Sequence, residues 1–201
     1  MQAIYEPCPC GSGTKFKFCC LRKSPQELLE NSDKFPVNEC LFSGEQGRRS
    51  GLTTVFVSRQ VVDGRYIIGT YMLDIYCLGV KDTFFKINIE RGELIVLKRR
   101  LRAKMDLDEL SYEDARSLIL GAVDYASKLG FEPQKDWRES RFIVESDRAY
   151  LPKFEFGYDG KPFYVPGPFD DSAAILRKLA VAQQQQLQSV GAPEQLLAVL
   201  A

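Results

Sequence analysis

Four of the six cysteines lie within 13 residues near the start of the chain, as a Cys-x-Cys pair followed by two adjacent cysteines. This density favours a metal site, because adjacent cysteines do not readily bridge each other and zinc takes four soft ligands in a tetrahedron. Pro9 stiffens the first pair, while Gly11 and Gly13 allow the turn that returns the second pair. We therefore predict one structural zinc ion bound by Cys8, Cys10, Cys19 and Cys20.

Four thiolates would close a tetrahedral site and leave no position for a substrate or a reactive water. The zinc is therefore predicted to stabilise structure, and it would supply the folding energy that so short a loop lacks. Nearby cations would offset the negative charge of four thiolates, and they make the module locally basic. An RNA contact is predicted through the same cations, which are Lys15, Lys17, Arg22 and Lys23.

Within residues 7–20, the segment that begins at Cys8 follows the pattern Cys-Pro-Cys-Gly-Ser-Gly-x-Lys-aromatic-Lys-x-Cys-Cys, with Thr14 at the first variable position. This segment resembles the SEC-C motif, the zinc-binding element at the C-terminus of the SecA preprotein translocase. Cys20 stands at the position of the last ligand, where the motif has Cys or His. The resemblance implies a module that contacts a protein or the ribosome, and it implies no activity for the rest of the chain.

Histidine is absent, which excludes Ser-His-Asp and Cys-His catalytic couples and histidine-based zinc protease sites. Lys plus Arg and Asp plus Glu both number 27, so the balance gives no global sign of a polyanionic partner. No apolar run is long enough to span a membrane. The N-terminal residues have neither a basic region nor an apolar core, so we expect no signal peptide and a cytoplasmic location.

Charged residues interrupt an apolar run at Asp74 and Lys81, with Cys77 between them. Asp74 and Lys81 would either pair or line a functional cleft. The alternative is a strand end with an exposed Asp74, followed by a turn at Lys81 and Asp82. Cys77 is expected to be a small buried hydrophobic residue, with a reactive thiol as the alternative.

Other charged segments give weaker signals. Residues 98–104 hold five cations, which form either a solvated helix face or a phosphate contact. Residues 157–162 lack the phosphate-loop pattern, and a hairpin turn explains them. Several carboxylates match no metal-binding loop, namely Glu145, Asp147, Glu155, Asp170 and Asp171.

Alternating and β-branched residues predict strands over 53–62, 65–76 and 83–89, the first two joined by a turn at Asp63-Gly64. Residues 93–97 would be a fourth strand or the start of a helix. A further hairpin is expected over 153–165, turning at Asp159-Gly160.

Helices are expected where apolar residues recur at three- and four-residue steps. One begins after Ser111 and ends at Gly130, and it must pack on the sheet. Another begins at Asp170 or Asp171 and runs to about Ser189, before a short terminal helix over 194–200. A short helix is also expected after Ser24, ending near Asp33, followed by a mobile basic loop over 44–51.

The predicted class is α+β: a small N-terminal zinc module plus an antiparallel sheet packed by two or more helices. We divide the chain into the zinc module (1–23), a linker with a short helix (24–51) and the body (52–201). Three segments of the body resemble landmarks of an uncharacterised domain found with SEC-C motifs. They are residues 74–84, 121–126 and 156–164.

Two functions follow as hypotheses. The first is a zinc-binding adaptor whose module docks on a macromolecular partner, such as the ribosome or an associated protein. The alternative is a hydrolase or nucleic-acid-processing enzyme with a cleft near Asp74 and Lys81, for which the zinc module acts as a recruiter.

Overall fold

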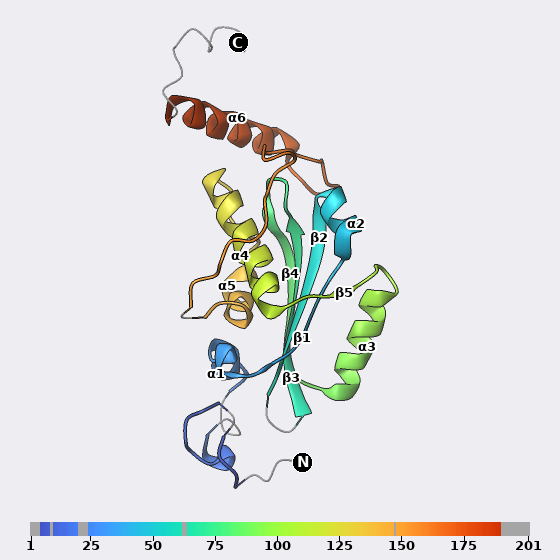
Figure 1. Ribbon diagram of the computed structural model, residues 1–201, viewed down its shortest axis with the longest axis vertical. Coiled ribbons are helices and arrows are strands. Elements are labelled where there is room, and N and C mark those ends of the chain that lie inside the picture. The colour runs from blue at the N-terminus through green and yellow to red at the C-terminus, as the bar shows by residue number, and fades with distance from the viewer. Residues whose placement is uncertain (1–4, 9, 20–23, 62–63, 147, 190–201) are drawn as a thin grey trace.

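Five antiparallel strands form one sheet, in the order β4-β3-β2-β1-β5. The computed structural model describes residues 5–8, 10–19, 24–61, 64–146 and 148–189 (Figure 1). The strands are β1 (Val37–Phe42), β2 (Leu52–Gln60), β3 (Arg65–Asp74), β4 (Gly79–Glu90) and β5 (Asp108–Glu109). The α+β class is confirmed, as are the strands predicted over 53–62, 65–76 and 83–89. Residue 63 of the turn that was predicted between the first two lies outside the described residues.

The two faces of the sheet are both buried, because successive side chains of a strand point to opposite faces. Val55 and Val57 of β2 face the larger core, whereas Phe56 between them joins a second core on the other side. Helix α4 (Tyr112–Lys128) covers the first face, and helix α3 (Arg91–Arg102) covers part of the second (Figure 1). The sheet is therefore the middle layer of the body.

Helix α4 begins and ends as its sequence predicts. The Ser111 hydroxyl accepts a hydrogen bond from Asp114 N (3.0 Å), and Gly130 follows the helix with φ +81°. Its apolar side packs on four strands, and Ala115, Leu118, Ile119 and Ala122 belong to the larger core. The prediction that this helix packs on the sheet is confirmed.

Other helix predictions are also confirmed. Ser24, Pro25 and Glu27 form the predicted capping box of α1 (Pro25–Glu30), and a 3-10 turn over Ser32–Lys34 follows it. Asp171 accepts a hydrogen bond from Ala174 N (3.0 Å) at the start of α6 (Ser172–Ser189). Residues 93–97 are part of helix α3, so the alternative of a fourth strand there is wrong. The terminal helix predicted over 194–200 lies outside the described residues.

Residues 24–51 contain more structure than a linker with a short helix. Strand β1 lies there, between β2 and β5, and its Cys40 and Leu41 are both buried because the sheet is covered on two sides. The loop predicted over 44–51 is wrong: residues Gly44–Ser50 form helix α2, which Gly51 ends with φ +79°. The division at residues 23 and 51 stays a prediction.

The hairpin predicted over 153–165 is wrong except for its turn. Asp159 and Gly160 have φ values of +50° and +73°, and the flanking Tyr158 and Lys161 form a single bridge. The residues beyond this bridge bond to the end of the sheet instead of to each other: Gly157 N donates to Ile75 O (2.9 Å) and Phe163 N to Tyr76 O (3.3 Å). Two short elements that we did not predict, α5 (Trp137–Ser140) and a 3-10 turn (Arg141–Ile143), pack against the sheet and α1.

Candidate metal centre

The cysteine loop is closed by backbone hydrogen bonds. Pro7 and Lys15 form an antiparallel bridge, and Cys8 N donates to Thr14 O (2.8 Å). Gly11 (φ +77°) and Gly13 (φ +69°) lie at the tip in the left-handed region that glycine adopts without strain. A 3-10 turn over Phe16–Phe18 then brings Cys19 back toward Cys8 and Cys10.

Three thiols meet at one point in this loop. The sulfur atoms of Cys8, Cys10 and Cys19 all lie within 4.8 Å of one another, and the Cys10 and Cys19 sulfurs are 3.5 Å apart. A tetrahedral zinc ion with Zn–S bonds of about 2.3 Å separates its sulfur ligands by about 3.8 Å. The donor set therefore fits a zinc ion, with three of its corners in place. Cys20, the predicted fourth ligand, lies outside the described residues.

The polar surroundings favour the thiolate form that binds metal ions. Burial raises the pKa of the Cys10 thiol, but hydrogen bonds from Ser12, Cys8 and Cys19 outweigh burial and lower it to about 6. The Ser12 hydroxyl also lies 3.1 Å from the Cys19 sulfur. No role was predicted for Ser12 beyond its place in the motif, because its contact with the thiols depends on how the loop closes.

One side of the cysteine loop is anchored in the core. The other side, which we call the displayed side, is exposed to solvent. Phe16 is 3% exposed and belongs to the same core as Leu28 and Leu29 of α1. Lys17 lies between two exposed aromatic rings, 5.0 Å from the ring centre of Tyr5 and 5.8 Å from that of Phe18. Lys15 is exposed on the same loop, whereas Arg22 and Lys23 lie outside the described residues.

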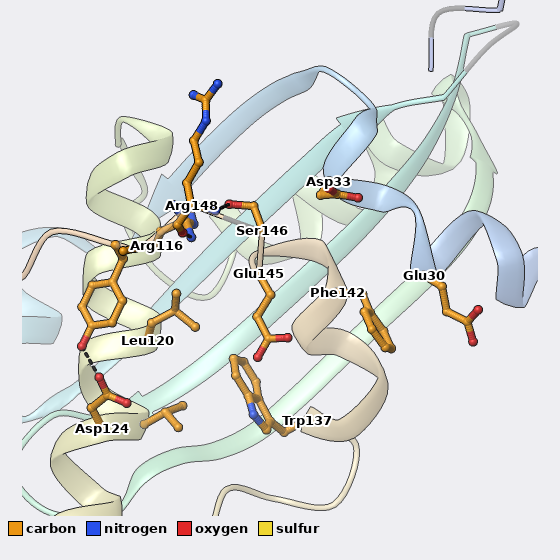
Figure 2. A pocket seen from close by; sticks show the side chains of 13 residues that line it. Glu30, Asp33, Arg116, Leu120, Asp124, Trp137, Phe142, Glu145, Ser146 and Arg148 are labelled. Carbon is orange, nitrogen blue, oxygen red and sulfur yellow. Dashed lines mark hydrogen bonds between the residues drawn. The ribbon is translucent and has the colours of Figure 1, made fainter. Parts of the chain in front are cut away.

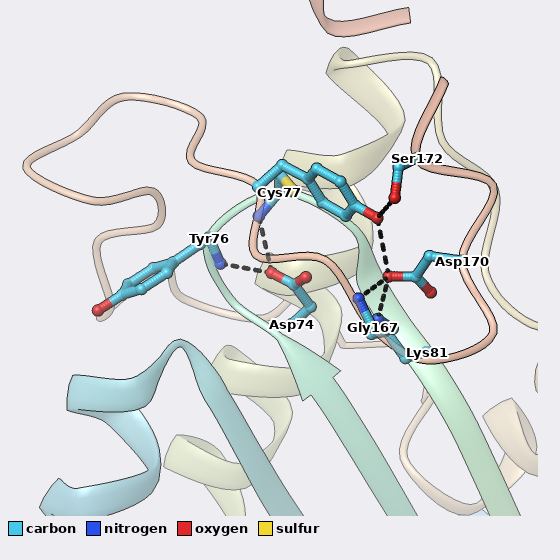
Figure 3. A network of polar contacts seen from close by, with 8 residues as sticks. Asp74, Tyr76, Cys77, Lys81, Gly167, Asp170 and Ser172 are labelled. Carbon is cyan, nitrogen blue, oxygen red and sulfur yellow. Dashed lines mark hydrogen bonds and ion pairs between the residues drawn. The ribbon is translucent and has the colours of Figure 1, made fainter. Parts of the chain in front are cut away.

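A second candidate site, around Asp74 and Lys81, has structural partners (Figure 3). Asp74 is 5% exposed, and one of its carboxylate oxygens accepts hydrogen bonds from Tyr76 N (3.0 Å) and Cys77 N (2.9 Å). Burial raises the pKa of Asp74, and these backbone donors partly offset the rise. Asp74 therefore caps the turn that ends β3. The strand end after Asp74 is as predicted, but Asp74 is buried instead of exposed, and Lys81 and Asp82 lie within β4 instead of in a turn.

Lys81 pairs with Asp170, not with Asp74. Its Nζ atom lies 2.9 Å from Asp170 Oδ2, which also accepts hydrogen bonds from Gly167 N (2.9 Å) and the Tyr164 hydroxyl (3.2 Å). This network ties the start of β4 to the loop before α6 (Figure 3). Residues 81 and 170 are far apart in the sequence, so the sequence could not predict this ion pair.

Replacing Lys81 by Met should lower the free energy of unfolding at neutral pH. It should also make that free energy less sensitive to a fall in pH. Burial raises the pKa of Asp170, but the Lys81, Gly167 and Tyr164 donors outweigh burial and hold it below its ordinary value. A depressed carboxylate pKa adds stability above the unfolded pKa, and this stability is lost as pH falls through the folded pKa. Urea unfolding should show a loss of about 1–2 kcal/mol at neutral pH and a shallower decline below about pH 4.

Lys86 offers the matched control for that change. It pairs with Glu93 at 3.7 Å, and both side chains are about half exposed. Replacing Lys86 by Met should change the unfolding free energy by no more than about 0.5 kcal/mol. Equal effects of the two substitutions at neutral pH would show that the Lys81–Asp170 pair adds nothing beyond surface charge.

Cys77 is a core residue. It is fully buried with Ala126, Leu129 and Phe131, and burial together with the Asp74 carboxylate raises the pKa of its thiol to about 12. Burial likewise raises the pKa of Cys40 to about 12. A protonated, buried thiol is a poor nucleophile, so the reactive-thiol alternative is wrong.

Neither Cys40 nor Cys77 should react with iodoacetamide in the native protein. With a pKa of about 12, the thiolate fraction at mildly alkaline pH is roughly one part in ten thousand, and both sulfurs are screened by the core. Peptide mass spectrometry should find both residues unmodified in native protein and fully modified after denaturation. Rapid modification of Cys77 in folded protein would contradict its place in the core.

The three body segments with the second resemblance meet at one end of the sheet. A Cβ atom on Gly79 would lie 2.7 Å from the Cβ of Ala126, so the turn after β3 packs directly on α4. Tyr125 of α4 stacks on Phe156 with 5.8 Å between ring centres, and Phe163 N donates to Tyr76 O (3.3 Å). The packing of these three segments on one another accounts for the residues that they contain.

The remaining charged candidates do not gather into a site. Arg99, Arg100, Arg102 and Lys104 are exposed on or just after α3, while Lys98 pairs with Glu39 at 2.5 Å. The solvated-helix interpretation of residues 98–104 is confirmed for the part within α3. Among the carboxylates, Glu145 pairs with Arg141, Glu155 is exposed, and Asp170 and Asp171 have the roles given above; Asp147 lies outside the described residues.

Comparison with known proteins identifies one part of the chain. Residues 6–22 match the family model of the SEC-C motif, so the resemblance of the cysteine loop to that motif is confirmed. No curated protein and no solved structure matches the chain, and the resemblance of the body segments stays a prediction. Within the described ranges, no helix is long and apolar enough to cross a membrane.

Proposed function

We propose that the chain is an adaptor, and that its SEC-C module docks on a macromolecular partner such as the ribosome or a ribosome-associated protein. In this proposal Cys8, Cys10, Cys19 and Cys20 hold one zinc ion, which supplies folding energy to the loop. Four thiolates leave no open coordination position, so the module serves recognition and not chemistry. Such partners would place the protein in the cytoplasm.

The observation that carries this proposal is the two-sided character of the loop. Phe16 fixes the loop to the core of the body, so its orientation is set before any partner arrives. Tyr5 and Phe18, which are 55% and 51% exposed, flank Lys17 on the displayed side. Exposed aromatic rings beside a cation suit both an acidic protein surface and the bases and phosphates of RNA.

The enzyme alternative gains no support from the region where it would act. Asp74 is occupied in capping a turn, Lys81 is paired with Asp170, and Cys77 is a protonated core thiol. Each of the three side chains has a structural partner that accounts for its position. We therefore retain the adaptor as the single proposed function.

Co-sedimentation with purified ribosomes tests this proposal. Wild-type protein should sediment with ribosomes at low salt, and its binding should weaken as salt rises because Lys15 and Lys17 face a polyanion. The double variant Cys19→Ser/Cys20→Ser should lose both zinc and partner. A Lys17→Ala/Phe18→Ala variant should keep its zinc and lose about tenfold in affinity, because the displayed side is changed and the ligands are not.

Arg138→Ala is the matched control for loss of charge. Arg138 is exposed in α5, away from the cysteine loop, and its removal should leave sedimentation unchanged. The same variants can be used in pull-downs from cell extract for a partner other than the ribosome. Identical partner recovery by Cys19→Ser/Cys20→Ser protein that has demonstrably lost its zinc would count against a docking role.

A further inference from the structure

Two arginines are buried beside the sheet, on the side covered by α4. Arg59 of β2 is 3% exposed and Arg116 of α4 is 8% exposed. Their guanidinium groups lie over the same ring, 4.7 Å and 5.9 Å from the centre of Tyr112. The fold therefore concentrates two permanent positive charges around one aromatic side chain.

Both arginines are held by main-chain carbonyl groups. Arg59 Nε donates to Ile143 O and Arg116 Nε donates to Val144 O, each at 2.8 Å. Arg116 Nη2 donates to Arg148 O (2.6 Å), which leaves its Nη1 with no hydrogen-bond partner among the described residues. These bonds fix the orientation of each guanidinium group, as a preformed anion site requires.

Within the described ranges, neither buried arginine forms an ion pair with a carboxylate. A buried cation without a counter-ion is costly, and carbonyl dipoles compensate it only in part. Within the described residues, these two positive charges are met by carbonyl groups and by the Tyr112 hydroxyl, and no carboxylate pairs with them. A bound anion would balance this charge through charge-assisted, bidentate hydrogen bonds, which guanidinium groups form with phosphate.

A cavity of about 540 Å³ opens at these arginines. Its wall includes Arg59, Arg116 and Arg148 and two carboxylates, Asp33 and Glu113. Lys153 also lines it, but its ammonium group pairs with Asp114 at 2.6 Å. Tyr112 and Tyr150 add aromatic surface. The volume exceeds what a free phosphate needs and falls in the range of small-molecule sites.

A neighbouring cavity of the same volume has the opposite character (Figure 2). It shares Arg116 and Arg148 with the first, but four carboxylates line it: Glu30, Asp33, Asp124 and Glu145. In Figure 2 the Arg116 and Arg148 side chains lie at one side of this acidic cavity. Asp33 lines both cavities, but the arginine-lined cavity has two carboxylates against four, so it is the more favourable of the two for an anion.

We propose that the arginine-lined cavity binds a small phosphorylated molecule. Its phosphate group would accept hydrogen bonds from Arg116 Nη1 and from Arg148, and its organic part would lie against Tyr112 and Tyr150. This site is separate from the cysteine loop and does not depend on the adaptor role proposed above.

Nuclear magnetic resonance of the arginine side chains tests the proposal. The Nε–H groups of Arg59 and Arg116 are bonded to buried carbonyls, so they should give protected, resolved signals in a ¹H–¹⁵N spectrum. Adenosine monophosphate and inorganic phosphate should each shift both signals in a saturable way, with adenosine monophosphate about tenfold tighter because it also uses the aromatic wall. Potassium chloride at matched ionic strength should not shift them.

Variants separate a specific site from general charge. Arg148→Ala removes an exposed side chain and should weaken phosphate binding about tenfold, whereas Arg138→Ala should not weaken it. Arg116→Lys keeps the charge but removes the planar guanidinium group and its paired N–H donors. The same tenfold loss of phosphate affinity is expected if this variant folds. Equal responses to phosphate and chloride, or wild-type affinity in Arg148→Ala protein, would overturn the proposal.

If inorganic phosphate and adenosine monophosphate bind equally tightly, the site recognises the phosphate alone. That result would overturn the part of the proposal that assigns an organic group to the aromatic wall. Saturable shifts with adenosine monophosphate that Arg148→Ala abolishes would support the whole proposal.

Discussion

Replacing Cys8 by Ser is expected to reduce the bound zinc from about one ion per chain to nearly none and to unfold the loop around it. Cys8 is 4% exposed, and its sulfur lies with those of Cys10 and Cys19. Structural zinc contributes about 10–16 kcal/mol to the folding of such short loops, far more than their few backbone hydrogen bonds. The metal is thus expected to decide whether residues 5–19 fold at all.

Metal analysis by mass spectrometry measures the zinc, and amide hydrogen exchange measures the fold of each segment. Amides of the loop, such as Cys8 N and Phe16 N, should lose protection in Cys8→Ser protein, while those of β2, β3 and α4 keep it. Cys40→Ala is the matched control, since Cys40 is equally buried and lies outside the cysteine cluster. A Cys8→Ser protein that retains one zinc per chain and a protected loop would contradict the assignment.

Gly79→Ala is expected to cause a large loss of stability in the body. Gly79 has φ +70°, and an added Cβ atom would lie 2.7 Å from the Cβ of Ala126 and 2.9 Å from Ala122 O. Backbone strain and the clash with α4 together should cost about 3–4 kcal/mol. Thermal unfolding should show a decrease in melting temperature of roughly 10 °C.

Gly130→Ala separates strain from clash. Gly130 has a similar φ of +81°, but nothing lies within 4 Å of its added Cβ atom. The substitution should therefore cost only the strain of the left-handed conformation, about 1 kcal/mol. Equal losses for Gly79→Ala and Gly130→Ala would mean that α4 does not pack against the turn after β3.

Regular elements with local signals could be predicted from the sequence. The capping residues Ser24 and Ser111 located the starts of α1 and α4, because a cap acts within a few residues of itself. Strand β1 was missed, because a strand buried on both faces has no alternating pattern to reveal it. The hairpin over 153–165 was wrong, since the turn at Asp159-Gly160 does not determine what its flanking residues bond to.

The metal site was more predictable than the other polar sites. The cysteine loop is short, so spacing alone brings Cys8, Cys10 and Cys19 together. The partner of Lys81 is Asp170, and Arg59 and Arg116 meet only at the packed face of the sheet. Such contacts join residues far apart in the chain, and single residues carry no signal of them.

X-ray absorption at the zinc edge, measured on the purified full-length chain, tests the central claim most directly. It reports the type and number of zinc ligands, including the contribution of Cys20. We predict four sulfur neighbours at about 2.3 Å and no nitrogen or oxygen neighbour. A zinc ion with fewer than four sulfurs, or with a bound water, would contradict a closed structural site.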